Sequence, residues 1–177
     1  MENEVVLVDL YDRPIGKLPK LEAHRQGKLH RAFSIFIYDG SKLLIQRRAV
    51  GKYHSAGLWA NSCCSHPRPG EELLEAAHRR LKEEAGITCP LHEVSSFVYR
   101  AIFDNGLSEY EVDHILVGEY DGTFTRNAEE ADDMRFVDMR QLSNDVIEHP
   151  ENYATWFITA YPIFLQAIEK ANCSRKG

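Results

Sequence analysis

The stretch EELLEAAHRRLKEEAG, residues 71–86, is the clearest helix in the sequence and decides the fold class. Its apolar positions recur at intervals of three and four residues, as the buried face of a helix requires: Leu74, Ala77 and Leu81. Arg80 and Glu84 stand one helical turn apart and carry opposite charges. Gly86 is the residue type at which helices commonly end in a left-handed conformation. We therefore predict one amphipathic helix in the middle of the chain.

Strands are predicted on both sides of this helix, because short runs of β-branched and aromatic residues occur there between turn signals. These strands are residues 5–10, 31–39, 42–49, 94–103, 110–120 and 134–139. Asp39-Gly40 is typical of a tight hairpin turn between the second and the third of them. The segments predicted to lack a long element are a turn at 12–16, a polar stretch at 19–32 and a loop at 51–62 that holds a short strand near its end.

The C-terminal stretch, residues 151–171, is predicted to be an amphipathic helix that covers the sheet. The order is therefore strands, one central helix, further strands and a last helix. That order indicates an α+β fold with a mixed sheet rather than a doubly wound parallel sheet.

Length and composition favour one domain. The chain has 177 residues, 44% of them hydrophobic, so we expect residues 1–177 to form a single domain with its own core. The 27 acidic and 21 basic residues give a net charge of −6, which argues against a nucleic-acid partner. The N-terminal residues lack the features of a signal peptide, and no apolar run approaches the roughly 20 residues that cross a bilayer. We therefore expect a cytoplasmic protein with no membrane partner.

The motif NSCCSHP, residues 61–67, places Cys64 two residues before His66. A disulfide, a metal site and a reaction centre are the three interpretations to compare. The four cysteines of the chain lack a disulfide framework spacing, and cytoplasmic thiols stay reduced. A structural zinc site in a binding module would need a second pair of closely spaced Cys or His residues, which the sequence lacks. The motif is therefore expected to be a reaction centre or part of a catalytic metal site.

Three histidines and two glutamates form a second candidate constellation. Glu109 and Glu111 stand two residues apart at the start of a predicted strand, so their side chains point to the same face. With His24, His30 and His66 they would make a nitrogen and oxygen site suited to manganese, magnesium or zinc. Each of these residues could equally be a solvated surface group. Sequence spacing alone does not show that they converge.

The central helix resembles the Nudix box, a motif that holds divalent metal ions on a diphosphate. The resemblance is carried by RRLKEEAGI (79–87) together with Glu71, and it puts Glu84 in the position of a metal ligand. The alternative is that Glu84 merely pairs with Arg80 on a solvated face. Arg80 stands where the hydrolase motif has a glutamate, and Ser65 stands where it has its leading glycine. The resemblance therefore implies a Nudix-type α/β/α sandwich with mixed sheets and a central Nudix-like helix, but not the usual diphosphate hydrolysis.

Most of the chain, roughly residues 7–167, resembles the type 1 isopentenyl-diphosphate isomerases, a Nudix-fold family of isoprenoid synthesis. Seven short motifs carry this resemblance: KLEAH (20–24), HRAFS (30–34), QRRAVGK (46–52), WANSCCSHP (59–67), YRA (99–101), EYE (109–111) and TW (155–156). The resemblance implies conversion of isopentenyl diphosphate into dimethylallyl diphosphate through a tertiary carbocation. A Nudix pyrophosphohydrolase acting on a nucleotide or another diphosphate is the alternative function.

The family's functional residues map onto this sequence one by one. Cys64 and Glu111 take the positions of the two proton-transfer groups, Tyr99 that of a hydroxyl near the acid, and Trp156 that of the aromatic ring facing the cation. Cys63 has no counterpart among these roles and is expected to be a small buried apolar residue.

The binding residues follow in the same way. The resemblance implies that a Mn²⁺ or Mg²⁺ ion, with Zn²⁺ a further candidate, is held by His24, His30, His66, Glu109 and Glu111. It also implies that Glu84 holds a Mg²⁺ ion that accompanies the diphosphate. The remaining substrate-binding residues are Lys20, Arg48, Lys52 and Cys64. The expected partner is therefore a small isoprenyl diphosphate, bound by a monomer or a homodimer.

Overall fold

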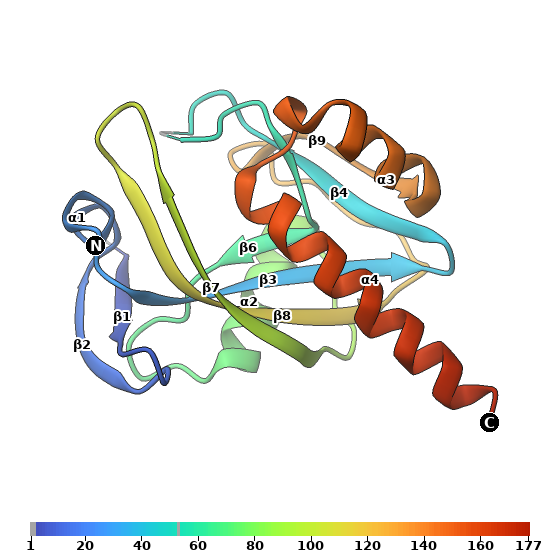
Figure 1. Cartoon of the computed structure of the whole chain (residues 1–177), viewed down its shortest axis with the longest axis horizontal. Helices are drawn as coiled ribbons and strands as arrows, with labels where there is room; N and C mark the ends of the chain where they lie inside the picture. The colour runs from blue at the N-terminus through green and yellow to red at the C-terminus, as the bar shows by residue number, and fades with distance from the viewer. Residues whose placement is uncertain (1–2, 53) are drawn as a thin grey trace.

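The computed structural model describes residues 3–52 and 54–177 of the chain, which form one mixed β-sheet with helices on both faces (Figure 1). Nine strands are present among the described residues: β1 (Glu4–Val8), β2 (Pro14–Pro19), β3 (His30–Asp39), β4 (Lys42–Arg48), β5 (Trp59–Ala60), β6 (Cys63–Ser65), β7 (His92–Ile102), β8 (Ser108–Glu119) and β9 (Ala131–Asp138). The helices are α1 (Lys20–Gln26), α2 (Leu73–Ala85), α3 (Met139–Glu148) and α4 (Thr155–Arg175), with a short 3₁₀ turn at Pro150–Asn152.

Strand β3 is the centre of the sheet and contacts four other strands. It pairs in parallel with β8 along almost its whole length, from His30 opposite Glu111 to Tyr38 opposite Glu119. It pairs antiparallel with β1, β4 and β6, and the register with β4 is confined to the residues next to the hairpin turn. Strand β7 extends the sheet beyond β8, and β9 extends it beyond β4. The parallel pairing of β3 with β8 brings the N-terminal part of the chain beside the 109–111 motif.

Side-chain alternation along the strands separates two hydrophobic cores. On one face, α2 packs through Ala77 and Leu81 against Ile35 and Leu116. On the other face, α4 packs through Phe157, and α3 through Leu142, against a core that includes Phe36 and Ile115. Figure 1 shows α4 crossing one face of the sheet and α2 lying behind it. The α/β/α layering and the mixed sheet confirm the predicted α+β fold.

The central helix begins at Leu73 and ends at Ala85, within the predicted range. Gly86 ends it in the left-handed conformation, with φ of 65°, as its residue type indicates. The prediction that Leu74 is buried is wrong, because this side chain lies in the first turn and stays 42% exposed. The buried side chains of α2 include Leu81, Glu84 and Ala85. Glu84 is therefore a buried carboxylate rather than one on a solvated face.

Three differences from the sequence prediction lie near the N-terminus and in the last helix. The turn predicted at 12–16 lies earlier, because the Asp9 carboxylate accepts hydrogen bonds from the backbone N–H groups of Tyr11 and Arg13, and β2 has begun by Pro14. The unassigned polar stretch contains α1, a helix of seven residues that ends at Gly27. The last helix begins at Thr155 instead of residue 151, because Tyr153 is extended and forms a bridge with Trp59.

Candidate active site

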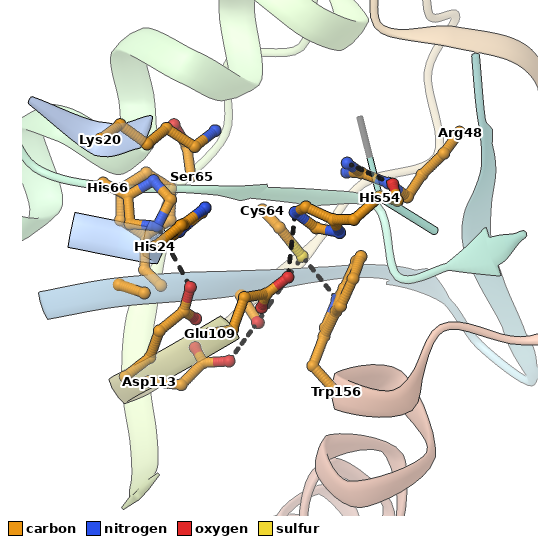
Figure 2. Close-up of a pocket in the computed structure, with 14 residues that line it drawn as sticks. Lys20, His24, Arg48, His54, Cys64, Ser65, His66, Glu109, Asp113 and Trp156 are labelled. Carbon is orange, nitrogen blue, oxygen red and sulfur yellow. Dashed lines mark hydrogen bonds and ion pairs between the residues drawn. The ribbon is translucent and has the colours of Figure 1, made fainter. Parts of the chain in front are cut away.

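Strand β8 supplies three carboxylates to one cavity of the protein. Glu109, Glu111 and Asp113 are alternate residues of β8, so their side chains share the face of the sheet that α4 covers. All three are buried. The parallel register with β3 puts His30 directly beside Glu111. The cavity that these residues line also contains Cys64, His66 and Trp156 (Figure 2).

Four of the five predicted metal ligands converge on one point. The ligand atoms of His24, His30, His66 and Glu111 all lie within 4.8 Å of one another. His30 Nε2 is 3.4 Å and His66 Nε2 is 3.2 Å from Glu111 Oε1. These residues come from three separate parts of the sequence: α1 and the start of β3, the residue after β6, and β8. Two imidazole nitrogens on one carboxylate oxygen, with a third imidazole nearby, make a ligand set for a divalent cation.

The hydrogen bonding of His30 shows that this group fits a metal ion. The ring donates from Nδ1 to the backbone carbonyl of Lys28 at 2.9 Å. A neutral ring held in this way carries its lone pair on Nε2, and this atom makes no hydrogen bond with any described residue although it is buried. Nε2 instead faces the Glu111 carboxylate. A cation between the two acceptors would satisfy both of them.

Burial sets the protonation states around this point. Burial, and then the neighbouring His30 ring, lower the pKa of His24 to about 3. Burial likewise lowers the pKa of His66 to about 4, against the opposing effect of Glu111. Burial alone would raise the pKa of Glu111, but the His30 and His66 imidazoles beside it hold this pKa well below its usual range. At neutral pH the site therefore presents His24 and His66 as unprotonated imidazoles and Glu111 as an ionised carboxylate, which are the forms that bind metal ions.

Glu109 lines the same cavity but lies outside the group of four. Its Oε1 atom is 3.0 Å from His54 Nε2, and both side chains are buried. Burial, followed by the negative charge of Glu111, raises the pKa of Glu109 well above its usual value. A cation shared with Glu111 would offset both effects.

Cys64 is held by a network of polar contacts within the cavity. Its thiol donates to Asn61 Oδ1 at 3.1 Å, and the Trp156 indole N–H lies 3.1 Å from its sulfur. On its other side, Sγ lies 3.6 Å from Ser34 Oγ, which donates to the Asp113 carboxylate at 2.8 Å. Burial, followed by the negative charge of Asp113, raises the pKa of the Cys64 thiol. Cys64 is therefore a protonated, oriented thiol facing the carboxylates of β8.

Trp156 lines this cavity, and Tyr99 is a second buried aromatic residue, paired with Glu111 in the sheet. Tyr99 lies opposite Glu111 in the antiparallel register of β7 and β8, and burial raises the pKa of its hydroxyl. Trp156 lies in the first turn of α4, and the guanidinium of Arg48 stands 5.2 Å from the centre of its ring. Arg48 therefore connects the buried cavity with a second, more polar cleft.

This second cleft lies beside α2 and carries most of the positive charge of the site. All four residues predicted to bind the diphosphate or its magnesium line it: Lys20, Arg48, Lys52 and Glu84. Burial, and then the charges of Arg48 and Lys52, lower the pKa of Lys20. The Lys52 ammonium forms an ion pair with Glu130. These side chains provide a cationic pocket of the kind that holds a diphosphate.

Arg80, the α2 residue that departs from the hydrolase motif, also lines this cleft. The Arg80 guanidinium lies 3.4 Å from both Glu84 and Glu130. Glu84 is buried, which raises the pKa of its carboxyl. The Cys63 thiol donates a hydrogen bond to Glu84, so Cys63 is buried as expected but is not merely an apolar residue. Glu84 and Cys63 thus face the α2 side of the sheet, opposite to Cys64.

Sequence reasoning missed three polar residues of the cavity: His54, Asn61 and Asp113. Asp113 could have been found, since it continues the two-residue alternation of Glu109 and Glu111 along one strand face. Asn61 belongs to the NSCCSHP motif but was not assigned a role. His54 stands alone in a loop and has no periodic signal.

Comparisons with known proteins agree with this geometry. The family model for the NUDIX domain matches residues 28–157, and the chain therefore belongs to the NUDIX class. Two solved structures share the fold: a Deinococcus radiodurans protein (TM-score 0.68, 19% identity, 82% of this chain and 90% of that one) and a MutT protein from Methanosarcina mazei (TM-score 0.63, 16% identity, 81% of this chain and 95% of that one). At these identities the likeness concerns the fold alone.

Sequence relatives define the family more narrowly. The chain is 53% identical to an isopentenyl-diphosphate Delta-isomerase 2 of Aromatoleum aromaticum, over 88% of this chain and 83% of that protein. It is 51% identical to an isopentenyl-diphosphate Delta-isomerase 2 of Photorhabdus laumondii, over 89% of each chain. A relative from Serratia proteamaculans with the name isopentenyl-diphosphate Delta-isomerase is 50% identical over 90% of this chain and 89% of its own length. This chain belongs to the isopentenyl-diphosphate isomerase family of NUDIX proteins.

Proposed function

We propose that this protein interconverts isopentenyl diphosphate and dimethylallyl diphosphate. The observation that carries the proposal is a buried cavity with a thiol and a carboxylate, Cys64 and Glu111, which opens next to a cationic cleft. Family membership and the names of the relatives support the same reaction. A five-carbon chain in the cavity would place its diphosphate in the cleft.

The reaction needs two proton-transfer groups on a substrate without an activated bond. A proton is added to one end of the alkene, and a proton is removed from the carbon on the other side of the new tertiary carbocation. We assign these transfers to Cys64 and Glu111, with Tyr99 placed beside the acid across the β7–β8 register. Cys64 is held ready by Asn61 and Trp156, which fix the direction of its S–H bond.

The carbocation must be protected from water, which would capture it at once. The cavity supports this requirement, since Cys64 is at least half-buried and the buried ring of Trp156 forms one wall. An aromatic face stabilises a desolvated cation by about 2 kcal/mol or more. Trp156 is therefore the residue assigned to the cationic centre.

Metal ions complete the proposed site. His24, His30, His66, Glu109 and Glu111 would hold a Mn²⁺ or Mg²⁺ ion, with Zn²⁺ also compatible with the nitrogen ligands. When bound, this ion supplies positive charge that makes the attached carboxyl group a stronger acid. Glu84 would hold a Mg²⁺ ion that accompanies the diphosphate, beside the cations Lys20, Arg48 and Lys52. These side chains keep the substrate anchored while its tail reacts.

Three features of the chain bear on its location and on the reaction that it catalyses. All four cysteines are free thiols, which supports a location in the reducing cytoplasm. Every helix in residues 3–52 and 54–177 is too short or too polar to cross a lipid bilayer. Arg80 stands in the position of a hydrolase glutamate, which argues against hydrolysis of the diphosphate.

The test is incubation of the purified protein with isopentenyl diphosphate and Mg²⁺. Proton NMR follows the dimethylallyl product, and a colorimetric assay follows free phosphate in the same sample. We expect the product to accumulate to an equilibrium mixture without phosphate release. Stoichiometric release of phosphate or pyrophosphate without a dimethylallyl product would make the protein a hydrolase instead.

A further inference from the structure

His54 is a buried histidine of the active-site cavity that has no role in the proposed reaction. It lies in the loop between β4 and β5, and its side chain is only 6% exposed. It is not among the four residues whose ligand atoms converge. Burying an imidazole costs free energy unless its nitrogens have polar partners. The place of this ring among carboxylates therefore suggests that it interacts with one of them.

The surroundings of His54 hold its ring in one orientation. The ring stacks on Phe103, with centres 4.8 Å apart and planes 13° apart. The Trp156 ring meets it edge-on at 6.1 Å. The Arg48 guanidinium donates to the backbone carbonyl of His54 at 3.3 Å, which ties this part of the loop to the diphosphate cleft. The ring is thus fixed on several sides by residues that do not bind metal.

This fixed ring presents Nε2 to the Glu109 carboxylate. The distance from His54 Nε2 to Glu109 Oε1 is 3.0 Å, and Figure 2 shows the two side chains facing one another across the cavity. The contact lies at ion-pair distance without the alignment of a hydrogen bond, and this oxygen accepts no hydrogen bond from any described residue. Glu109 therefore has a neighbour that fixes its position and keeps lone pairs to spare.

Glu109 needs such a neighbour, because it is the predicted ligand that lies outside the converging group. Strand β8 fixes the backbone of Glu109 two residues before Glu111, on the same face of the sheet. Without a neighbour, rotation about its side-chain bonds could still turn the carboxylate away from the metal site. Outer partners that orient a ligand contribute strongly to metal affinity, and their loss typically costs roughly 10–100-fold.

We propose that His54 is a positioning residue that holds the Glu109 carboxylate in place for the metal ion. The inference rests on the proposed function in one respect, namely that the His and Glu cluster binds a divalent cation. It extends the metal site to the loop that follows Arg48 and contains Lys52, and both of these residues line the cationic cleft. The site would then be assembled partly by the same loop that receives the substrate.

The experiment measures Mn²⁺ affinity directly, by the electron paramagnetic resonance signal of the free ion during titration. His54→Phe keeps the stacking on Phe103 but removes both nitrogens, and we expect its Kd for Mn²⁺ to rise roughly 10–100-fold. His54→Gln keeps an N–H donor of similar reach and should bind Mn²⁺ nearly as well as the wild type. His149→Phe is the matched control, since it removes an exposed histidine that contacts Glu151 outside the site, and its affinity should not change.

A second pair of measurements separates positioning from general damage to the fold. The metal-free melting temperature of each variant shows whether it folds, and the rise in melting temperature on adding Mn²⁺ should shrink for His54→Phe alone. If His54→Phe does not fold, His54→Asn replaces it, because its shorter amide cannot reach Glu109 and should weaken binding where His54→Gln does not. Equal affinity of His54→Phe and wild type would overturn the proposal.

An equal loss in His54→Phe and His54→Gln would also overturn it, since the imidazole itself would then be a ligand. Failure of the proposed reaction is a separate result. A wild-type protein that binds Mn²⁺ in the expected His54-dependent way but produces no dimethylallyl diphosphate would refute the isomerase function and leave the role of His54 intact.

Discussion

The two sides of strand β6 build two different environments from neighbouring residues. Cys64 pairs with Ser34 across the β3–β6 register and faces the histidines and the carboxylates of β8. Cys63 pairs with Ile35, faces α2 and donates its thiol proton to Glu84. The alternation of a β-strand thus sends two adjacent cysteines into different sites. The same residue type acquires its role from the face on which it lies.

The two environments differ in how their charges are balanced. On the Cys64 side, the ligand atoms of His24, His30 and His66 gather around the Glu111 carboxylate, which suits a cation that stays in place. On the α2 side, Arg80 and Lys52 are already paired with carboxylates. Such paired cations can exchange partners when a diphosphate arrives and leaves. The first region is therefore expected to control chemistry and metal retention, and the second to control substrate binding.

The largest effect is expected where the two regions touch. Cys64→Ala removes a proton-transfer group outright, so kcat should fall roughly 10²–10⁴-fold, the contribution typical of general acid–base catalysis. Cys63→Ala should retain most of the activity, because it removes only a hydrogen bond to Glu84. Steady-state kinetics of both variants measures the difference. Equal losses in the two variants would refute the assignment of the two faces.

The metal content should depend on the first region only. His66→Ala removes an imidazole 3.2 Å from Glu111, so the protein should lose its bound divalent ion, with an affinity loss at least as large as the roughly 10–100-fold of an outer partner. Elemental analysis of the purified proteins should find about one ion per chain in the wild type, since one ligand group is present among the described residues. His78→Ala, on α2, is the control and should keep its metal. Full occupancy in His66→Ala would remove this residue from the ligand set.

The metal-free protein should become less stable as the pH is lowered, because His66 in the first region is buried with a lowered pKa. The pKa of His66 is about 4 in the folded protein, against about 6.5 in an unfolded chain. Between these values the unfolded chain binds a proton that the folded chain does not, so the free energy of unfolding decreases as the pH falls from 6.5 to 4. His66 alone accounts for a loss on the order of 3 kcal/mol.

Urea unfolding of the chelator-treated protein at pH 7, 5.5 and 4 measures this loss. His66→Gln cannot take up a proton, so its stability should depend less steeply on pH than that of the wild type. Identical slopes for the two proteins would contradict the inferred burial of a neutral imidazole.

The smallest effect is expected in the second region. Arg48→Ala removes one charged contact to the diphosphate, and at the low end of the usual range such a contact is worth about 1.5 kcal/mol, so KM should rise roughly tenfold. Arg175→Ala is the matched control, since Arg175 is exposed and pairs with Glu119 far from the cleft. An unchanged KM in Arg48→Ala would contradict a role in diphosphate binding. Arg48 would then be a structural residue that contacts Trp156 and the backbone of the β4–β5 loop.

The sequence predicted the local features of both regions and missed the non-local ones. The alternation of Glu109 and Glu111 and the end of α2 at Gly86 follow from spacing that a single strand or helix imposes. The pairing of His30 with Glu111 arises from a parallel register between strands about 80 residues apart, which no local pattern encodes. Helix α1 was missed because its seven residues are too few to show a recognisable helical periodicity of apolar residues.

The two faces of NSCCSHP were also beyond sequence reasoning by itself. Strand β6 has three residues, so its alternation is too short to be recognised without its partner β3. The family resemblance chose Cys64 over Cys63 but gave no reason for the choice. The structure supplies that reason in the contact of Cys63 with Glu84 and of Cys64 with Asn61 and Trp156.

The most direct test of the account is isomerisation in heavy water. If Cys64 and Glu111 add and remove protons, the proton added to isopentenyl diphosphate must come from the solvent, and the dimethylallyl product should carry deuterium in a methyl group. Glu111→Gln should abolish this uptake while still binding the substrate through Arg48 and Lys52, because an amide cannot relay a proton as a carboxyl group does. Mass spectrometry of the product measures the label. A dimethylallyl product free of deuterium would contradict the account.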